Sequence, residues 1–435
     1  MLLATFKKVS EMKNNYASTR SAENFSLKDF CTAGDVSLDE RVNNFSDWIK
    51  DRTGSGDILY RRLVMGKMDR VVTIKDPFTG QQKNMLMFGS NNYLGLATHP
   101  YVLQHLQKAI QTFGHGIGGP PLLNGYTRLH HDVEESLALL KGTEDCLITA
   151  SGYMANLSWV NGLLSNGDTM FFDEHNHSSV FFGLSTVKCR KIPFRHNDLN
   201  DLEDKLKQYR KNTGDYYLVV EGVYSMDGDL CPLPELMHLV YTYHLKLIID
   251  DAHGTGVKGK NGGGLTNHFN IHEGVFLHVG TFSKALASIG GFVAGDKKVI
   301  DYLRYMAAPY MFSASAPPTI LGTVFGGLEV IKQEPGIRQK LFENIDQLVK
   351  QLSDAGIEVE GHSPIIPIIV PQRGVVKNMS IELHHKGLFV NSVVYPAVPE
   401  NKERLRISLS AVHSKDDIDR LAYELIAVLK IKEVI

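Results

Sequence analysis

From Asp145 onward, short apolar or β-branched runs alternate with longer amphipathic segments, such as Leu199 to Tyr209 and Pro234 to His244. Apolar runs of this length favour buried strands, and strands that alternate with helices form βαβ units. The alternation therefore predicts an α/β fold with a mostly parallel central sheet flanked by helices. The expected strands are Cys146 to Thr149, Thr169 to Phe172, Tyr217 to Val220, Leu245 to Ile249, Phe276 to Val279 and Phe292 to Ala294.

The chain on either side of this region has a different character. Residues 1 to 56 are polar, mixed in charge and poorly periodic, and we expect an N-terminal arm that packs on a partner subunit. After Pro317 and Pro318 the pattern is typical of a smaller α+β domain. It consists of a helix over 319–355, strand-like segments at 364–371, 388–394 and 405–409, and a final helix from Asp416. We predict three parts: an arm with a small-domain segment (1–88), a large domain (89–318) and a C-terminal small domain (319–435).

Composition favours small-molecule partners over nucleic acid or membrane. The 435 residues are 43% hydrophobic and 22% charged, with a formal charge of −2 and no basic stripe to match a phosphate backbone. The four cysteines are scattered without a CxxC pair, which is typical of a reducing compartment. The apolar start is too short for a signal peptide, and no run approaches the roughly 18 apolar residues of a membrane span. We therefore expect a cytoplasmic protein.

The most informative polar residues follow the expected strands, where open α/β sheets build their sites. Lys284 closes Gly280-Thr281-Phe282-Ser283-Lys284, and Asp250 directly follows the apolar run Leu245 to Ile249. A lysine that forms an imine with a cofactor aldehyde needs a carboxylate partner for the pyridine nitrogen. Taken singly, Lys284 could be a surface lysine and Asp250 a helix cap. Together they predict a pyridoxal phosphate (PLP) enzyme.

Three further features fit a PLP site, each with a plainer alternative. His177 is placed to stack on a cofactor ring, although it could be an ordinary hydrogen-bonded histidine. With Asp173 and His175 it could also bind metal, but no further clustered ligand completes such a site, so no metal is expected. Ser151-Gly152-Tyr153 joins a strand to a helix and offers free N–H groups to a phosphate. Arg406 is a cation within an apolar strand, and either a substrate carboxylate or a structural salt bridge would satisfy it.

Two stretches fit the GxGxxG pattern of dinucleotide-binding folds, but neither has the required context. Residues 114–119 follow a helical pattern and run into Pro120-Pro121, whereas the fingerprint needs a strand before it and a helix after it. Residues 254–259 follow a strand, but glycines at 262–264 prevent a helix from starting. We therefore do not expect a nicotinamide-dependent dehydrogenase.

Five motifs in order resemble the α-oxoamine synthases, a family of fold-type I PLP-dependent acyltransferases. The resemblance covers residues 60 to 430. The motifs are Ser90-Asn91-Asn92-Tyr93-Leu94-Gly95-Leu96, Glu221-Gly222-Val223-Tyr224-Ser225-Met226-Asp227-Gly228, Asp250-Asp251-Ala252-His253-Gly254-Thr255-Gly256, the Lys284 motif, and Phe312-Ser313-Ala314-Ser315.

The resemblance implies a role for each matched residue. Lys284, Asp250, His177 and His253 would be the catalytic group, with Lys284 joined to the cofactor and Asp250 bound to its ring nitrogen. Asn91 and Arg406 would bind the amino-acid substrate. Ser313 and Ser315 would reach the phosphate of a neighbouring subunit, which implies a homodimer. The cofactor-binding set would be Ser151, Gly152, Tyr153, His177, Glu221, Ser225, Asp250, His253, Thr281, Lys284, Ser313 and Ser315.

The reaction implied is the decarboxylative condensation of a small amino acid with an acyl thioester. Local similarity around Lys284 and Asn124 favours the bacterial serine palmitoyltransferases, and hence L-serine and a long-chain acyl group. The nearest alternatives are 8-amino-7-oxononanoate synthase, glycine C-acetyltransferase and a non-catalytic partner subunit on the same fold. Two positions depart from many relatives: Val394 stands where several bacterial members carry arginine, and Pro120-Pro121 replaces a more polar pair near the expected acyl entrance.

Overall fold

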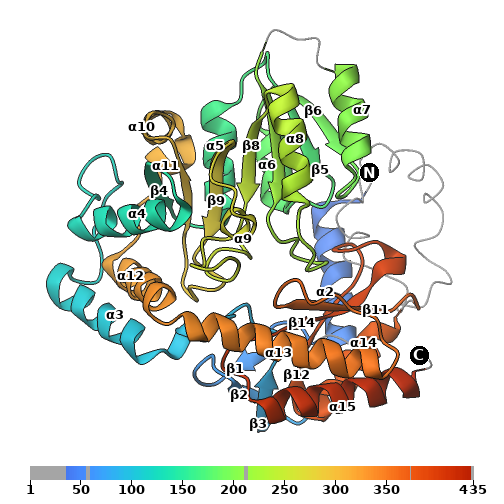
Figure 1. Cartoon of the computed structure of the whole chain (residues 1–435). Coiled ribbons are helices and arrows are strands. Elements are labelled where there is room, and N and C mark those ends of the chain that lie inside the picture. Colours follow the sequence, from blue (N-terminus) through green and yellow to red (C-terminus); the bar gives the residue numbers. More distant parts are fainter. Residues whose placement is uncertain (1–35, 55–58, 210–213, 373, 433–435) are drawn as a thin grey trace.

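The computed structural model describes residues 36–54, 59–209, 214–372 and 374–432. Its largest element is a seven-stranded sheet with the order β4-β10-β9-β8-β7-β5-β6 (Figure 1). All neighbours pair in parallel except β10, which runs antiparallel to both β4 and β9. The strands are β4 (Asp145–Thr149), β5 (Thr169–Asp173), β6 (Arg190–Phe194), β7 (Tyr216–Glu221), β8 (Lys246–Asp250), β9 (Val275–Thr281) and β10 (Gly291–Gly295).

Buried side chains alternate between the two faces of this sheet, which explains the continuous apolar runs. In β7, Tyr217 and Val219 pack on one face and Leu218 and Val220 on the other. The first face is covered by α5 (Gly152–Leu163), α6 (Ser178–Ser185), α10 (Lys297–Met306) and α11 (Ala308–Met311), and the second by α7 (Leu199–Tyr209), α8 (Leu233–Tyr243) and α9 (Leu265–Phe269). The predicted α/β fold is confirmed, with β6 as a strand that the pattern did not reveal.

The C-terminal part contributes a three-stranded antiparallel sheet with the order β11 (Ile365–Ile369), β14 (Arg404–Ser408), β13 (Asn391–Val393). The short strand β12 (Leu388–Phe389) instead pairs in parallel with β3 (Gln82–Met87), which continues through β2 (Val71–Lys75) to β1 (Leu63–Val64). Residues 63–87 thus fold with the C-terminal part: Lys83 Nζ donates to the carbonyl oxygen of His384 in α14 (Val375–His385), and Arg70 pairs with Asp417 in α15 (Lys415–Ile431). The boundaries proposed at 88/89 and 318/319 stay predictions.

Two sequence expectations need correction. The single helix expected over 319–355 is two helices, α12 (Pro318–Gln333) and α13 (Pro335–Asp354), because Pro335 lacks an N–H and clashes with the preceding turn of a continuous helix. The poorly periodic arm contains a 17-residue helix, α2 (Leu38–Gly54). The rest of that arm, residues 1–35, lies outside the described residues.

The first GxGxxG stretch follows the helix α3 (Pro100–Phe113) and leads into turns. The second forms turns after β8, well before α9 begins. Both lack the strand–turn–helix context, as predicted.

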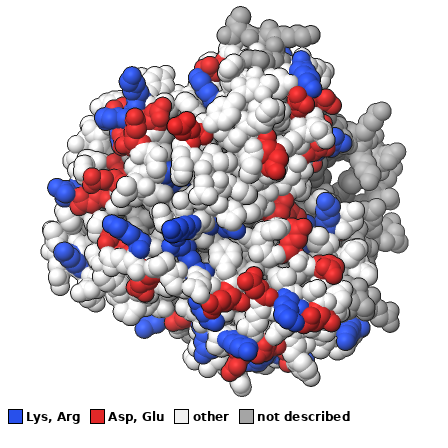
Figure 2. Space-filling model, in the orientation of Figure 1, with Lys and Arg blue, Asp and Glu red and all other residues white. Residues whose placement is uncertain are grey.

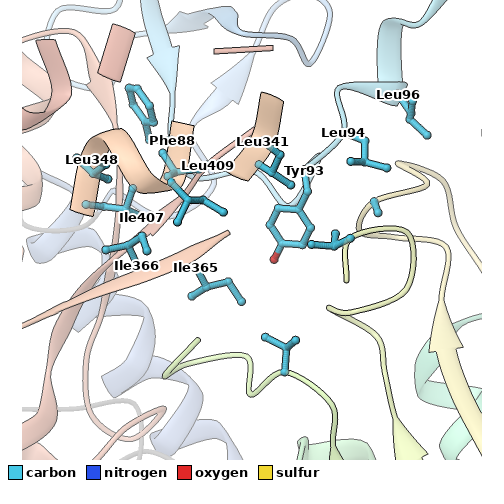
Figure 3. Close-up of a cluster of buried hydrophobic side chains, with 14 of the residues drawn as sticks. Phe88, Tyr93, Leu94, Leu96, Leu341, Leu348, Ile365, Ile366, Ile407 and Leu409 are labelled. Atoms are coloured by element: carbon cyan, nitrogen blue, oxygen red, sulfur yellow. The ribbon is translucent and has the colours of Figure 1, made fainter. Parts of the chain in front are cut away.

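A hydrophobic cluster joins the large sheet region to the C-terminal part. Figure 3 shows Tyr93 and Leu94 near Leu341 of α13, with Ile365 and Ile407 from the C-terminal strands close by. The helices α3, α4 (Arg128–Lys141) and α12 extend this layer. The cluster therefore fixes the Ser90 to Leu96 segment against the sheet that carries Arg406.

Charges of both signs are interspersed over the face drawn in Figure 2, in keeping with the near-zero net charge. Within the described parts of the chain, no helix is both long and apolar enough to cross a membrane.

Candidate active site

The carboxyl ends of β7, β8 and β9 bring the predicted cofactor residues together. Glu221 ends β7 opposite Asp250 at the end of β8, and Asp250 pairs in register with Val279 of β9. The chain then leaves β9 at Thr281 and passes through the loop that holds Lys284 before returning as β10. Adjacent parallel strands thus deliver two carboxylates and an amine to one edge of the sheet, as the sequence predicted.

The Lys284 amine sits in an environment that disfavours its charge. The loop is held by Phe282, whose backbone N–H donates to Gly290 and whose ring is fully buried. Burial lowers the pKa of Lys284 from its usual value, and Arg406 contributes to the shift, while Asp250 and Glu221 oppose it. A neutral lysine amine is the form that attacks an aldehyde or accepts a proton.

Asp250 and Asp251 are adjacent in sequence but have different partners. Asp250 Oδ2 accepts a hydrogen bond of 2.7 Å from Asn156 Nδ2, and its Oδ1 accepts from the N–H of Ala252. Asp251 Oδ2 pairs instead with Lys141 Nζ at 2.7 Å, and both side chains are fully buried. Asp250 is therefore the carboxylate at the strand edge, whereas Asp251 has a structural partner.

A chain of hydrogen bonds links Asp250 to His177. The second proton of Asn156 Nδ2 goes to Ser179 Oγ at 2.9 Å, and Ser179 Oγ lies 2.7 Å from His177 Nδ1. Trp159 Nε1 donates to Asn156 Oδ1, which sets the orientation of the amide. The backbone N–H of Ser179 also donates to His177 Nδ1 at 3.3 Å, so Nδ1 is an acceptor and the proton of the neutral imidazole lies on Nε2. Burial lowers the pKa of His177, in agreement with a neutral ring.

His253 belongs to a second polar chain. Its Nδ1 lies 2.7 Å from the Tyr93 hydroxyl, and that hydroxyl donates to Asn91 Oδ1 at 3.0 Å. Burial lowers the pKa of His253 well below its usual value, and the cations Lys284 and Arg406 add to the effect. His253 is therefore neutral, fixed through Tyr93, and within electrostatic range of Lys284.

Arg406 reaches the site from β14 of the C-terminal sheet. Its guanidinium donates to the carbonyl oxygen of Ser225, to Asn91 Oδ1 and to Ser408 Oγ at 2.7, 3.2 and 3.0 Å. These partners are neutral oxygens, and no ion pair among the described residues includes Arg406, although it is only 7% exposed. The salt-bridge alternative is therefore wrong for the described residues, and a buried cation without an anion favours an anionic ligand.

Glu221 offers an unused polar atom to this space. Its Oε2 accepts from the N–H of Ser225 at 3.2 Å, while its Oε1 is buried without a partner among the described residues. Burial raises the pKa of Glu221 well above its usual value, and Asp250 strengthens the shift. A protonated Glu221 can donate a hydrogen bond, for example to a phenolic oxygen.

The turn that precedes α5 is built for close approach. Ser151 Oγ caps the helix by accepting from the N–H of Met154. A Cβ at Gly152 would lie 2.7 Å from the Cβ of Thr281, so only glycine lets this turn pack against the end of β9. The Tyr153 ring lies edge-on to His177, with centroids 6.3 Å apart. Thr281 and the first N–H groups of α5 therefore share one corner of the site.

Ser313 and Ser315 line a small cavity together with Thr149 and Ala150, next to the Ser151 turn. The backbone N–H of Ser315 donates a hydrogen bond to the carbonyl oxygen of Gly119. The Oγ of Ser315 is buried without a partner among the described residues. Neither serine is hydrogen-bonded to Lys284, Asp250 or His177 in the described ranges. Their predicted role at a partner's phosphate stays a prediction.

The pattern Asp173-x-His175-x-His177 does not gather into a metal site. Asp173 binds His196 and Tyr224, His175 Nδ1 faces Asp227 at 3.3 Å, and His177 binds Ser179.

Sequence reasoning missed Asn156 and Ser179, and it left Tyr93 without a role. Asn156 is a buried, hydrogen-bonded amide on the inner face of α5, near the buried residues Ala155 and Trp159. An amide on the face of a helix that apolar residues bury is the signal that could have found it, since a buried polar side chain needs partners.

Comparison with known proteins agrees with this geometry. Residues 83–425 match the family described as aminotransferase class I and II. The chain belongs to this family. It is 36% identical to a serine palmitoyltransferase of Sphingobacterium spiritivorum, over 91% of this chain and 98% of that protein. It is also 36% identical to an 8-amino-7-oxononanoate synthase of Bacillus subtilis, over 79% of this chain and 87% of that protein.

Solved structures show the same relationship. A serine palmitoyltransferase variant from S. paucimobilis with a bound PLP–myriocin aldimine superposes with a TM-score of 0.86 at 28% identity. The match covers 92% of this chain and all of that one. The resemblance to the α-oxoamine synthases, the fold-type I architecture and the PLP-dependent acyltransferase class are thereby confirmed.

The described residues fit PLP. A lysine of lowered pKa lies beside a buried carboxylate, a neutral histidine, an unpartnered oxygen of Glu221, and a glycine turn at the start of α5. Lys284 would bind the aldehyde carbon, Asp250 the ring nitrogen, and Gly152 with Thr281 the phosphate. When bound, the cofactor supplies an electron sink for charge that develops on the substrate α-carbon.

Proposed function

We propose that the protein condenses a small amino acid with an acyl thioester and releases carbon dioxide, with L-serine and a long-chain acyl-CoA as the best candidates. The observation that carries this proposal is Arg406. It is a buried guanidinium without an acidic partner among the described residues, close enough to Lys284 to shift its pKa. An amino acid offers the carboxylate that such a cation lacks, and its α-carbon would then lie near the lysine amine.

Each residue has a defined task in this reaction. Arg406 and Asn91 hold the substrate carboxylate, and Asp250 keeps the ring nitrogen protonated. The Lys284 amine takes the α-proton, and the α-carbon then forms a bond to the thioester carbonyl carbon while the thiolate leaves with a proton. The carboxyl group next departs as carbon dioxide, and the α-carbon regains a proton to give an α-amino ketone.

The segment expected near the acyl entrance supports a long apolar acyl donor. The segment Pro120-Pro121-Leu122-Leu123 carries no charge, and Leu123 is 81% exposed, which argues against the alternative that the whole segment is core packing. A groove that buries methylene groups gains about 0.8 kcal/mol for each one. The similarity to a serine palmitoyltransferase and to an 8-amino-7-oxononanoate synthase leaves pimeloyl with alanine as the second candidate.

We also propose a homodimer in the cytoplasm. Phe312, Tyr305 and Met306 are 83%, 62% and 53% exposed around the segment that holds Ser313 and Ser315. Large apolar side chains gathered on a surface favour contact with a second chain. In such a dimer Ser313 and Ser315 would complete the partner's phosphate site.

A matrix of substrates tests the proposal. Purified holoenzyme is offered serine, glycine and alanine against acetyl, succinyl, pimeloyl and palmitoyl thioesters, and thiol release is measured. We expect the highest rate with serine and palmitoyl. A preference for alanine with pimeloyl would select the second candidate, and glycine with acetyl or succinyl would reject both. No release with any pair, despite bound PLP, would favour a non-catalytic subunit.

A further inference from the structure

The strand that carries Arg406 carries a second buried arginine on the same face. Arg404 and Arg406 are separated by one residue on β14, so their side chains point the same way. Arg404 is 1% exposed and Arg406 is 7% exposed. A substrate carboxylate could therefore bind to either of two neighbouring buried guanidinium groups.

The loop after β7 distinguishes the two cations. Arg404 donates to Asp227 Oδ1 at 2.6 Å and to the carbonyl oxygen of Met226 at 2.9 Å. Among the described residues, Arg406 donates only to neutral atoms, one of which is the carbonyl oxygen of Ser225. Asp227 thus neutralises Arg404 and leaves the charge of Arg406 uncompensated.

The same loop is held firmly on both sides. Gly228 has a φ of +73°, and a Cβ there would collide with the carbonyl oxygen of Ile365 in β11, so the loop backbone abuts the C-terminal sheet. On its other side, His175 Nδ1 lies 3.3 Å from Asp227 Oδ2. Although burial acts to raise it, the pKa of Asp227 is lowered by its interactions with His175 and Arg404, so the group is ionised.

A shift of this loop would reach the cofactor side as well. The N–H of Ser225 binds Glu221 and its carbonyl oxygen binds Arg406. The three consecutive residues Ser225, Met226 and Asp227 therefore connect the end of β7 to both arginines of β14.

We propose that Asp227 is a positioning residue that selects the carboxylate-binding cation: by pairing with Arg404, it leaves Arg406 as the single free guanidinium for the amino-acid substrate. This inference rests on the proposed function, because it assumes that an amino acid binds at Arg406. Asp227 itself touches neither substrate nor cofactor in this account, and acts through Arg404 and the loop.

The test is a spectral titration of the PLP holoenzyme with L-serine, glycine and L-alanine. Asp227→Asn frees Arg404 as a second, non-productive site for the carboxylate, so the spectral change at saturating amino acid should fall at least tenfold while the borohydride-reducible chromophore remains. Asp227→Glu, which keeps the charge, should recover part of that loss. Asp229→Asn is the matched control, since Asp229 lies in the same loop but pairs with His196. It should bind the amino acid as the wild type does.

A double-mutant cycle decides whether Asp227 acts through Arg404. The double variant Asp227→Asn/Arg404→Gln lacks the released guanidinium, so its spectral amplitude should return towards that of Arg404→Gln alone, which should be close to the wild-type value. An amplitude in the double variant as low as in Asp227→Asn, or an unchanged amplitude in Asp227→Asn, would overturn the proposal. Should Asp227→Asn not fold, Arg404→Gln is tested by itself, and a loss of amplitude in that variant would also overturn the proposal.

The outcomes also separate this inference from the proposed function. If the wild-type holoenzyme shows no spectral response to any of the three amino acids, the proposed function fails. If the wild type responds and Asp227→Asn responds equally, only the role of Asp227 fails.

Discussion

The carboxyl edge of the large sheet and the three-stranded C-terminal sheet supply different parts of the candidate site. At the large sheet, Asp250 and Glu221 lie close enough to Lys284 to oppose the lowering of its pKa by burial. At the C-terminal sheet, Arg406 has only neutral partners in the part of the chain that the structure describes. The first region can hold a positively charged cofactor ring without any substrate, whereas the second lacks an anion until one binds. Substitutions in the two regions should therefore affect different measurements.

The largest effect is expected at Lys284. Lys284→Ala removes the amine that joins the cofactor and moves the α-proton, so turnover should fall by about 10³-fold or more. The variant should remain folded and lose its borohydride-reducible visible absorbance. A variant that kept a reducible chromophore would transfer the role to another lysine.

The adjacent carboxylates Asp250 and Asp251 give the sharpest contrast within the large sheet. Asp250→Asn should retain PLP but slow α-proton exchange by orders of magnitude, each factor of ten costing about 1.4 kcal/mol of barrier. Asp251→Asn leaves Lys141 buried without its partner and should lower the free energy of unfolding by about 3–5 kcal/mol. The α-proton exchange rate is measured by NMR, and the free energy of unfolding is measured by urea denaturation. The two measurements distinguish the Asp250 variant from the Asp251 variant. Normal exchange in Asp250→Asn would contradict the assignment.

A substitution of Arg406 tests the role of the three-stranded C-terminal sheet. Arg406→Gln removes charge-assisted hydrogen bonds worth about 1.5–3 kcal/mol, so KM for the amino acid should rise roughly 10- to 150-fold. The cofactor spectrum should stay as in the wild type, because the large sheet holds PLP. Loss of the chromophore together with affinity would mean that the two regions are not separable.

Asn156 links Asp250 to His177 by hydrogen bonds that run through Ser179. Asn156→Ala deprives Asp250 of a hydrogen bond and leaves Trp159 Nε1 unpaired, which should cost about 1–3 kcal/mol of stability and also slow α-proton exchange. Asn161→Ala serves as the control, because Asn161 lies on the same helix and bonds only to Thr186. Its stability should change by about 0.5 kcal/mol or less. Equal behaviour of the two variants would contradict the link.

Stability against pH can be tested at His196, which lies after β6 and bonds to Asp229 of the loop after β7. Hydrogen bonds to Asp173 and Asp229 outweigh burial and raise the pKa of His196 to about 10. Because folding raises this pKa, protonated His196 contributes its full stabilisation of the folded state below the unfolded-state pKa of about 6.5. That contribution is lost as the pH rises through about 10. The stability advantage over His196→Gln should therefore shrink between these limits in urea denaturation at pH 6, 8 and 10. A pH-independent difference would argue for packing alone.

Local pattern was enough to predict most of the large sheet and the cofactor side of the site. Continuous apolar runs mark strands buried on both faces, and the residues that follow them collect at one edge of a parallel sheet. The sequence pattern did not predict β6, because Arg-Lys-Ile-Pro-Phe is an edge strand in which only one side chain, that of Phe194, is fully buried. That Lys284 and Asp250 lie at the same end of the sheet could be predicted from their motifs, because each follows a strand of that sheet.

What only the tertiary structure decided is which polar groups pair across long stretches of chain. Asn156 meets Asp250 across 94 residues, Tyr93 meets His253 across 160, and Arg404 meets Asp227 across 177. Periodicity reports which side of a strand or helix is buried, but it carries no information about the partner that faces a buried polar atom. Packing of the C-terminal sheet against the loop after β7 supplies that information. It is the reason that Arg404 has an acidic partner while Arg406, on the same strand, has neutral ones.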